Sequence, residues 1–258
     1  MHIPRVRFSL APVSREASVL RKFLAVDGTG WDKSGYIYHQ HPQLQKLLEG
    51  VRNGDDRYQL IHGYVRQYRR NNVNEFQEAL KQNENLWRPI ENEYLQTLSE
   101  HFETPFPSRR KIIRAYVSLI PIYPRWLDTW EFNVSYFQPE RVRELACHEI
   151  LHFLWFKKWR EVLPETNKEE CNAPHLVWRL SEILDPVILN EHPVFKEYFD
   201  HQQQTYTHFQ RIRIGAVQPT TYFARLYRKH LSSGAPFADF IHLVDQEGKK
   251  HASAIMGA

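Results

Sequence analysis

One stretch of the chain, residues 144–156, limits what the sequence can fold into more than any other. It is apolar on nearly every side of a helix, which predicts a helix buried inside the protein. The same stretch contains the pattern His-Glu-x-x-His, at His148, Glu149 and His152. Burying two imidazoles and a carboxylate is costly unless they are paired or bind a metal ion. The sequence therefore predicts a polar cluster or a metal site on a helix in the hydrophobic core.

The spacing of the two histidines favours a metal ion. A helix has about 3.6 residues per turn, so His148 and His152 lie one turn apart and both rings can bind the same ion. Glu149 lies to the side, where its carboxylate can reach a water molecule on that ion. The alternative is a pair of core histidines satisfied by hydrogen bonds, in a helical interaction protein whose motif is accidental.

These residues resemble the active-site helix of the zincin metallopeptidases, which are zinc-dependent hydrolases. The resemblance implies that His148 and His152 bind one Zn²⁺ ion and that Glu149 is the general base. Peptide bonds would then be hydrolysed through a zinc-bound water, and the expected partner is a peptide or protein substrate. The alternative with this fold is a catalytically weak regulatory protein or a metal-dependent binding protein.

A tetrahedral zinc ion that keeps one water needs a third protein ligand. Glu182 fits best, because it lies in the middle of an apolar helical segment, 175–185, where an unpaired carboxylate is costly. This helix resembles the glutamate helix of the gluzincins, a branch of the zincins. Asp185 is then expected to accept a ring N–H of a motif histidine. Glu170 is the second candidate for the ligand, and the further candidates are Glu161, Glu165, Glu169, His175, Glu191 and His192.

The oxyanion of the proposed chemistry needs one more hydrogen-bond donor, usually a tyrosine or histidine from the C-terminal half. The sequence offers several and does not choose among them: Tyr206, His208, Tyr222, Tyr227 and His230.

Two segments rich in β-forming residues, 112–120 and 130–137, precede the predicted helix at 144–156, here called the metal helix. The second alternates apolar and polar residues, which predicts a strand with one face packed inward. In zincins the strand before the metal helix is the sheet edge that borders the cleft. The resemblance therefore implies that extended substrate binds along Asn133, Val134 and Ser135.

Apolar residues at helical spacing occupy most of the remaining sequence, including 42–101 and 191–250. We therefore predict an α+β, mostly helical zincin-like fold. It has a small mixed sheet whose edge strand precedes the His-Glu-x-x-His helix, and a helical C-terminal lobe. One two-lobed catalytic domain is expected over residues 1–258. Residues 1–160 would hold the sheet and the metal helix, and 161–258 would supply the third ligand.

Charge and composition exclude some functions. The net charge is only +4, and the local clusters around Arg66–Arg70 and Arg109–Arg114 are typical of solvated helix faces, so no nucleic acid is expected. The sequence has no apolar run long enough for a membrane span and no secretory signal pattern. Its two cysteines lack the spacing of a zinc site, which favours a reduced, cytoplasmic protein.

Overall fold

The computed structural model of the chain describes residues 2–24, 33–51 and 54–257. It forms two compact units that alternate along the sequence. The first unit comprises Met1–Arg5, Ile90–Lys111 and Ala146–Ala258, and the second comprises Val6–Pro89 and Ile112–Leu145. The sequence predicted consecutive lobes that meet at residue 160. The units alternate instead, because strand pairing and helix packing join segments that are distant in the sequence.

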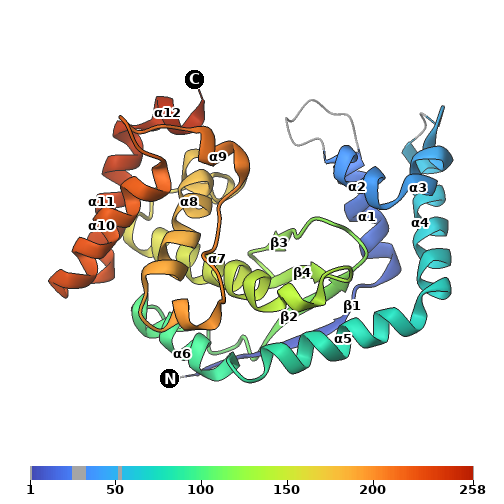
Figure 1. Cartoon of the computed structure of the whole chain (residues 1–258), viewed down its shortest axis with the longest axis horizontal. Coiled ribbons are helices and arrows are strands. Elements are labelled where there is room, and N and C mark those ends of the chain that lie inside the picture. The colour runs from blue at the N-terminus through green and yellow to red at the C-terminus, as the bar shows by residue number, and fades with distance from the viewer. Residues whose placement is uncertain (1, 25–32, 52–53, 258) are drawn as a thin grey trace. The chain divides into compact units, whose positions relative to one another are not determined.

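The fold is α+β and mostly helical, as predicted, with 64% of the chain in helices and 9% in strands. One four-stranded sheet has the order β1-β2-β4-β3 (Figure 1). Its strands are β1 (Arg5–Leu10), β2 (Ile112–Ser118), β3 (Arg125–Trp126) and β4 (Glu131–Ser135). β4 pairs in parallel with β2 and antiparallel with β3, so the sheet is mixed.

The prediction that the strand before the metal helix is a sheet edge is wrong. β4 is paired on both sides, with β2 and with β3. The Asn133 N–H also donates to the carbonyl of Pro124, the residue before β3, at 3.1 Å. Asn133, Val134 and Ser135 are almost completely buried. They therefore do not form the exposed substrate-binding edge that the resemblance implied. The strand that covers this edge, β3, has only two residues, too few to give an alternating pattern in the sequence.

The α-helices that lie wholly in the second unit are, among the described residues, α1 (Val13–Leu24), α2 (Ser34–Gln40), α3 (Pro42–Leu48), α4 (Gly54–Asn71) and α5 (Val73–Trp87). Their apolar faces form a common core with Leu119, which follows β2. Inside it the Glu16 carboxylate is fully buried and accepts hydrogen bonds from Ser118 Oγ at 2.8 Å and from the Leu119 N–H at 2.9 Å. Arg69 Nη2 lies 2.6 Å from the same carboxylate, so this arginine, predicted on a solvated face, forms a largely buried ion pair.

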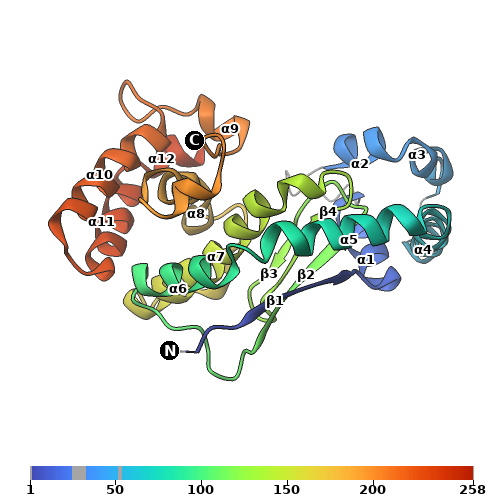
Figure 2. The same cartoon turned by 60° about the horizontal axis from the view of Figure 1, so that its bottom comes forward.

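The first unit is helical. Its helices are α6 (Glu91–His101), most of α7 (Val142–Val162), α8 (Leu176–Glu191), α9 (Thr207–Arg211), α10 (Pro219–Ser233), α11 (Phe237–Lys250) and α12 (Ala252–Met256). The described residues also form the 3-10 helices η2 (Lys168–Cys171) and η3 (Phe195–Tyr198) in this unit, and η1 (Pro139–Arg141), which belongs to the second unit and precedes α7. α8 is the central helix here, because α10, α11 and α12 all pack on it (Figure 2). It continues through Pro186, which lies inside the helix.

α11 approaches α8 closely because Gly248 has no side chain. A Cβ atom at this glycine would lie 2.5 Å from Leu180 Cδ1, closer than carbon atoms can pack. The contact brings α11 against the same helix that carries the predicted third ligand.

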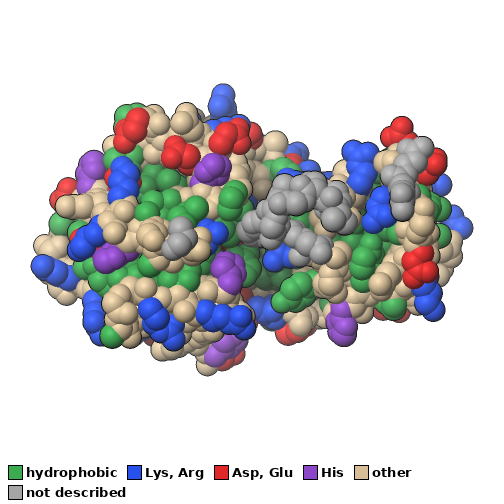
Figure 3. All heavy atoms as spheres, turned by 90° about the horizontal axis from the view of Figure 1, so that it is seen from above, with side chains coloured by type: hydrophobic (Ala, Val, Ile, Leu, Met, Phe, Trp, Pro, Cys, Tyr) green, Lys and Arg blue, Asp and Glu red, His purple; other side chains and the backbone are tan. Residues whose placement is uncertain are grey.

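The surface carries charges of both signs. On the face drawn in Figure 3, Lys and Arg side chains are scattered among acidic and uncharged ones. No helix in the described part of the chain has both the length and the apolar character needed to cross a membrane.

Candidate metal centre

The helix that carries the His-Glu-x-x-His motif, α7, is buried as the sequence predicted. α7 is apolar around most of its circumference, and His152 is completely buried on it. Glu149 is 4% exposed, whereas the His148 side chain is 25% exposed. The polar motif is thus held in an apolar environment, with one histidine reaching toward solvent. Fully buried neighbours fix the helix on its other sides: Ala146, Cys147, Ile150, Leu151 and Leu154.

α8 brings two carboxylates to this motif. Glu182 and Asp185 are three residues apart and therefore project from the same face of the helix. They are 1% and 2% exposed. Burying two carboxylates together is expensive unless cations or hydrogen-bond donors compensate them. Both residues lie beside His148, Glu182 near its Nε2 atom and Asp185 at its Nδ1 atom.

Potential ligand atoms of three residues converge at the centre of this cluster. The Nε2 atoms of His148 and His152 lie 3.1 Å apart. The Glu182 carboxylate spans them, with Oε2 at 3.4 Å from His148 Nε2 and Oε1 at 3.5 Å from His152 Nε2. These two distances exceed the range of about 2.7–3.2 Å for ordinary N–H···O hydrogen bonds.

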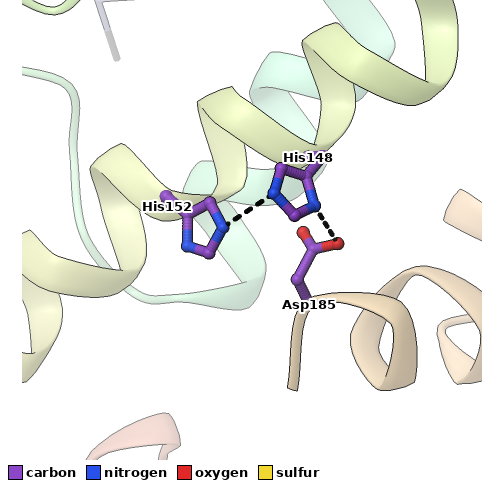
Figure 4. Close-up of side chains that lie close together, drawn as sticks. All are labelled: His148, His152 and Asp185. Atoms are coloured by element: carbon purple, nitrogen blue, oxygen red, sulfur yellow. Dashed lines mark hydrogen bonds and ion pairs between the residues drawn. The ribbon is translucent and has the colours of Figure 1, made fainter. Parts of the chain in front are cut away.

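Asp185 contacts the other side of His148. Its Oδ2 accepts a hydrogen bond from His148 Nδ1 at 2.6 Å, while Nε2 of the same ring is directed at His152 (Figure 4). The second Asp185 oxygen is buried and makes no hydrogen bond within the described residues. His148, His152 and Asp185 offer ligand atoms that all lie within 4.8 Å of one another, so this buried group could hold a metal ion.

The cluster carries more negative than positive charge. Burial alone lowers the pKa of His148, but Asp185, Glu182 and Glu149 outweigh it and raise that pKa well above its usual value. A protonated His148 can link Asp185 to His152 by hydrogen bonds, which is the arrangement available without a cation. The negative charge of three buried carboxylates still exceeds the positive charge of one imidazolium. These side chains therefore suit a divalent cation.

Two supporting residues were missed from the sequence. Tyr94 is fully buried on α6, and its hydroxyl donates to the Cys147 carbonyl on α7 at 2.5 Å, next to His148. Thr205 Oγ1 donates to the Glu182 carbonyl at 2.8 Å. Neither contact has a local sequence signal, because each joins segments that only the tertiary fold brings together.

Glu170, the second candidate for the third ligand, has a local role. Its carboxylate accepts a hydrogen bond from the Asn167 N–H at 2.7 Å and closes a capping box at the start of η2. Glu170 thus supports a helix end.

The candidate oxyanion donors divide into residues on α10 and residues that follow Thr205. Tyr227 is buried and hydrogen-bonded to His101 Nε2 at 2.7 Å, and Tyr222 donates to Glu247 at 2.5 Å. His230 packs on the aromatic side chains of α11. Tyr206 and His208 instead follow Thr205, the residue that contacts Glu182, and Tyr206 is 42% exposed.

Comparisons of the chain with protein-family models, with curated proteins and with solved structures find no match. The geometry and chemistry of the metal centre are therefore the basis for a function.

Proposed function

We propose that the protein is a zinc-dependent metallopeptidase whose ion is held by His148, His152 and Glu182. The observation that carries this proposal is the spacing of four ligand atoms from these three residues. The two Nε2 atoms lie 3.1 Å apart, and each lies 3.4 or 3.5 Å from a different oxygen of Glu182. Bonds of about 2.0–2.2 Å in a tetrahedral zinc site separate neighbouring ligand atoms by about 3.3–3.6 Å. Two of the distances fall in this range and the third is slightly shorter.

Asp185 is assigned a supporting role, although it belongs to the same group of potential ligands. Its contact is with His148 Nδ1, on the side of the ring away from His152 Nε2. A carboxylate on the second nitrogen of a ligating histidine fixes the orientation of the ring and makes it a stronger ligand. Glu182 is the better ligand because its two oxygens face both Nε2 atoms.

Glu149 is the proposed general base. Its Oε1 lies 3.9 Å from His148 Nε2, beside the ligand atoms, and its side chain is 5% exposed. Zinc bound by the three ligands supplies a Lewis acid that polarises a carbonyl and makes water more acidic. Glu149 then takes the proton from the attacking water and delivers it to the leaving amine. Tyr206 and His208 are the proposed donors for the oxyanion, since they follow Thr205, which contacts Glu182.

The test combines metal analysis with a cleavage assay. Protein purified without added metal is expected to contain one zinc per chain and to cleave fluorescein-labelled casein. Glu149→Gln keeps the size of the side chain but removes the base. It should retain zinc and lose about 100- to 10,000-fold in rate. Glu144→Gln, on the same helix but paired with Arg141 at 2.9 Å, serves as the matched control and should match the parent.

Four outcomes contradict parts of the proposal. A protein that neither contains nor takes up zinc has no such centre. Cleavage by Glu149→Gln at the parental rate excludes this residue as the base. Loss of zinc in that variant makes Glu149 structural. Zinc without any cleavage by the parent favours the alternative, a regulatory or metal-dependent binding protein.

A further inference from the structure

An irregular segment between η3 and α9, residues 202–206, runs along α8, the helix that carries Glu182 (Figure 1). The Gln203 N–H donates to Asn190 Oδ1 at 2.8 Å, and Asn190 Nδ2 donates back to the Gln203 carbonyl at 3.0 Å. Two residues later Thr205 Oγ1 donates to the Glu182 carbonyl. Three hydrogen bonds therefore attach this segment, here called the α8 strap, to the helix that supplies the proposed third ligand.

The anchoring points require the α8 strap to be extended. Asn190 and Glu182 are separated by a little more than two helical turns, about 12 Å along the axis. The two residue steps from Gln203 to Thr205 span at most about 7 Å, and side chains must cover the remainder. The strap therefore runs nearly straight, antiparallel to α8.

An extended chain directs its backbone groups to alternate sides. Both backbone groups of Gln203 point toward α8, so those of Gln202 and Gln204 point the opposite way. Within the described residues the backbone of Gln204 makes no hydrogen bond, and the side chains of Gln202 and Gln204 are exposed. The outer side of the α8 strap is thus a short edge of free N–H and C=O groups.

We infer that this edge binds the substrate backbone, with an extended peptide adding to the α8 strap as a strand. The inference rests on the proposed function and gives it a substrate-binding edge in place of β4, which is paired on both sides. Thr205 touches Glu182 itself, so a peptide on this edge passes beside the proposed ligand. The strap contains no charged residue between Gln202 and Tyr206. Recognition is therefore through main-chain hydrogen bonds, and many peptide sequences should fit.

The first arm of the test removes one outward donor. Gln204→Pro deletes the N–H while suiting an extended chain, and should lower kcat/KM for fluorescein-labelled casein about tenfold. Gln204→Ala keeps the N–H and should lose less. Asp200→Pro is the matched proline control, because the preceding Phe199 is already extended at φ −127° and ψ 135°. Zinc content and the thermal midpoint are measured for each variant to confirm folding.

The second arm needs no catalysis. Amide hydrogen exchange across residues 200–208 is followed in zinc-loaded Glu149→Gln while a mixture of random ten-residue peptides is added. Slower exchange at Gln202 and Gln204 is expected. Protection that instead follows protein concentration without peptide would assign the edge to a second copy of the chain and overturn the inference.

The two arms separate this inference from the proposed function. Cleavage by the parent, with Gln204→Pro within twofold of Asp200→Pro and no protection by peptides, overturns the binding edge and leaves the peptidase. Equal losses in Gln204→Pro and Gln204→Ala assign binding to the side chain and also overturn it. Peptide protection without cleavage by the parent overturns the peptidase and leaves a peptide-binding edge.

Discussion

Replacing Asp185 by asparagine distinguishes a residue that supports the metal centre from one that binds the ion. Asparagine keeps the size of the side chain and an acceptor oxygen for His148 Nδ1, but it removes the charge. The Asp185 carboxylate lies 2.6 Å from this nitrogen and its side chain is 3% exposed, so water screens the interaction little. A hydrogen bond to a charged group contributes about 1.5–3 kcal/mol, and a neutral one about 0.5–1.5 kcal/mol. The difference, about 1–2 kcal/mol, predicts zinc binding weakened by about 5- to 30-fold.

The zinc dissociation constant is measured by competition with a chromophoric chelator at neutral pH. Glu182→Gln removes a proposed ligand and should weaken binding by a larger factor than Asp185→Asn. Glu191→Gln is the control, since this carboxylate at the end of α8 pairs with Arg228 at 3.0 Å instead. It should leave the zinc dissociation constant unchanged.

Two results would refute this reasoning. Equal losses in Asp185→Asn and Glu182→Gln would make Asp185 itself a ligand. An unchanged dissociation constant in Asp185→Asn would mean that the hydrogen bond to His148 does not support the site. Denaturant unfolding of each metal-free variant identifies any loss that comes from the fold.

Three further predictions concern stability. Glu16→Ala leaves Arg69 buried without its carboxylate and should lower the free energy of unfolding by about 3 kcal/mol, measured with urea. Gly248→Ala places a Cβ against buried Leu180 and should cost about 1–2 kcal/mol by the same measurement. Burial lowers the pKa of His101 to about 3, so its contribution to stability is complete above about pH 6.5 and is lost as the pH falls toward 3. The unfolded chain binds the proton first, and His101→Gln should reduce the acid-induced loss by up to about 1.4 kcal/mol per pH unit.

The first two of these predictions have a control variant. Glu49→Ala removes an exposed carboxylate and should change the free energy of unfolding by less than about 0.5 kcal/mol. Gly63→Ala, inside α4 with nothing within 4 Å of the new Cβ, should stabilise the protein by about 0.5–1 kcal/mol. Losses below about 1 kcal/mol for Glu16→Ala, or stabilisation by Gly248→Ala, would contradict the packing described. Identical pH dependence in parent and His101→Gln would contradict the pKa shift.

Most of the candidate site could be predicted because its signals are local. The i, i+4 spacing places His148 and His152 on one helix face whatever the rest of the fold is. The cost of burying Glu182 and Asp185 on an apolar helix then points to a partner, and the motif histidines are that partner. Tyr94 and Thr205 could not be predicted, because a hydroxyl that reaches a distant carbonyl leaves no periodic pattern.

The error about β4 has a physical cause. An alternating pattern reports which face of a strand is buried, but not how many neighbours pair with its edges. β3 contributes only Arg125 and Trp126, and pairing of these two residues is enough to cover the edge of β4. The α8 strap could not be predicted either. Its extended form depends on contacts with α8, and its polar sequence has no alternating strand pattern.

The alternation of the two units along the sequence affects how the chain folds during synthesis. The Glu16 carboxylate meets Ser118 across 102 residues, a stretch that takes a ribosome about 5–20 s to make at about 5–20 residues per second. Before residues 118–120 are made, α1 can pack on α4, but the apolar surface that Leu119 and Ile120 cover remains exposed. The Glu16 carboxylate beside this surface still lacks its two hydrogen-bond donors, Ser118 Oγ and the Leu119 N–H. The core of the second unit is therefore complete only after residues 118–120 have been made.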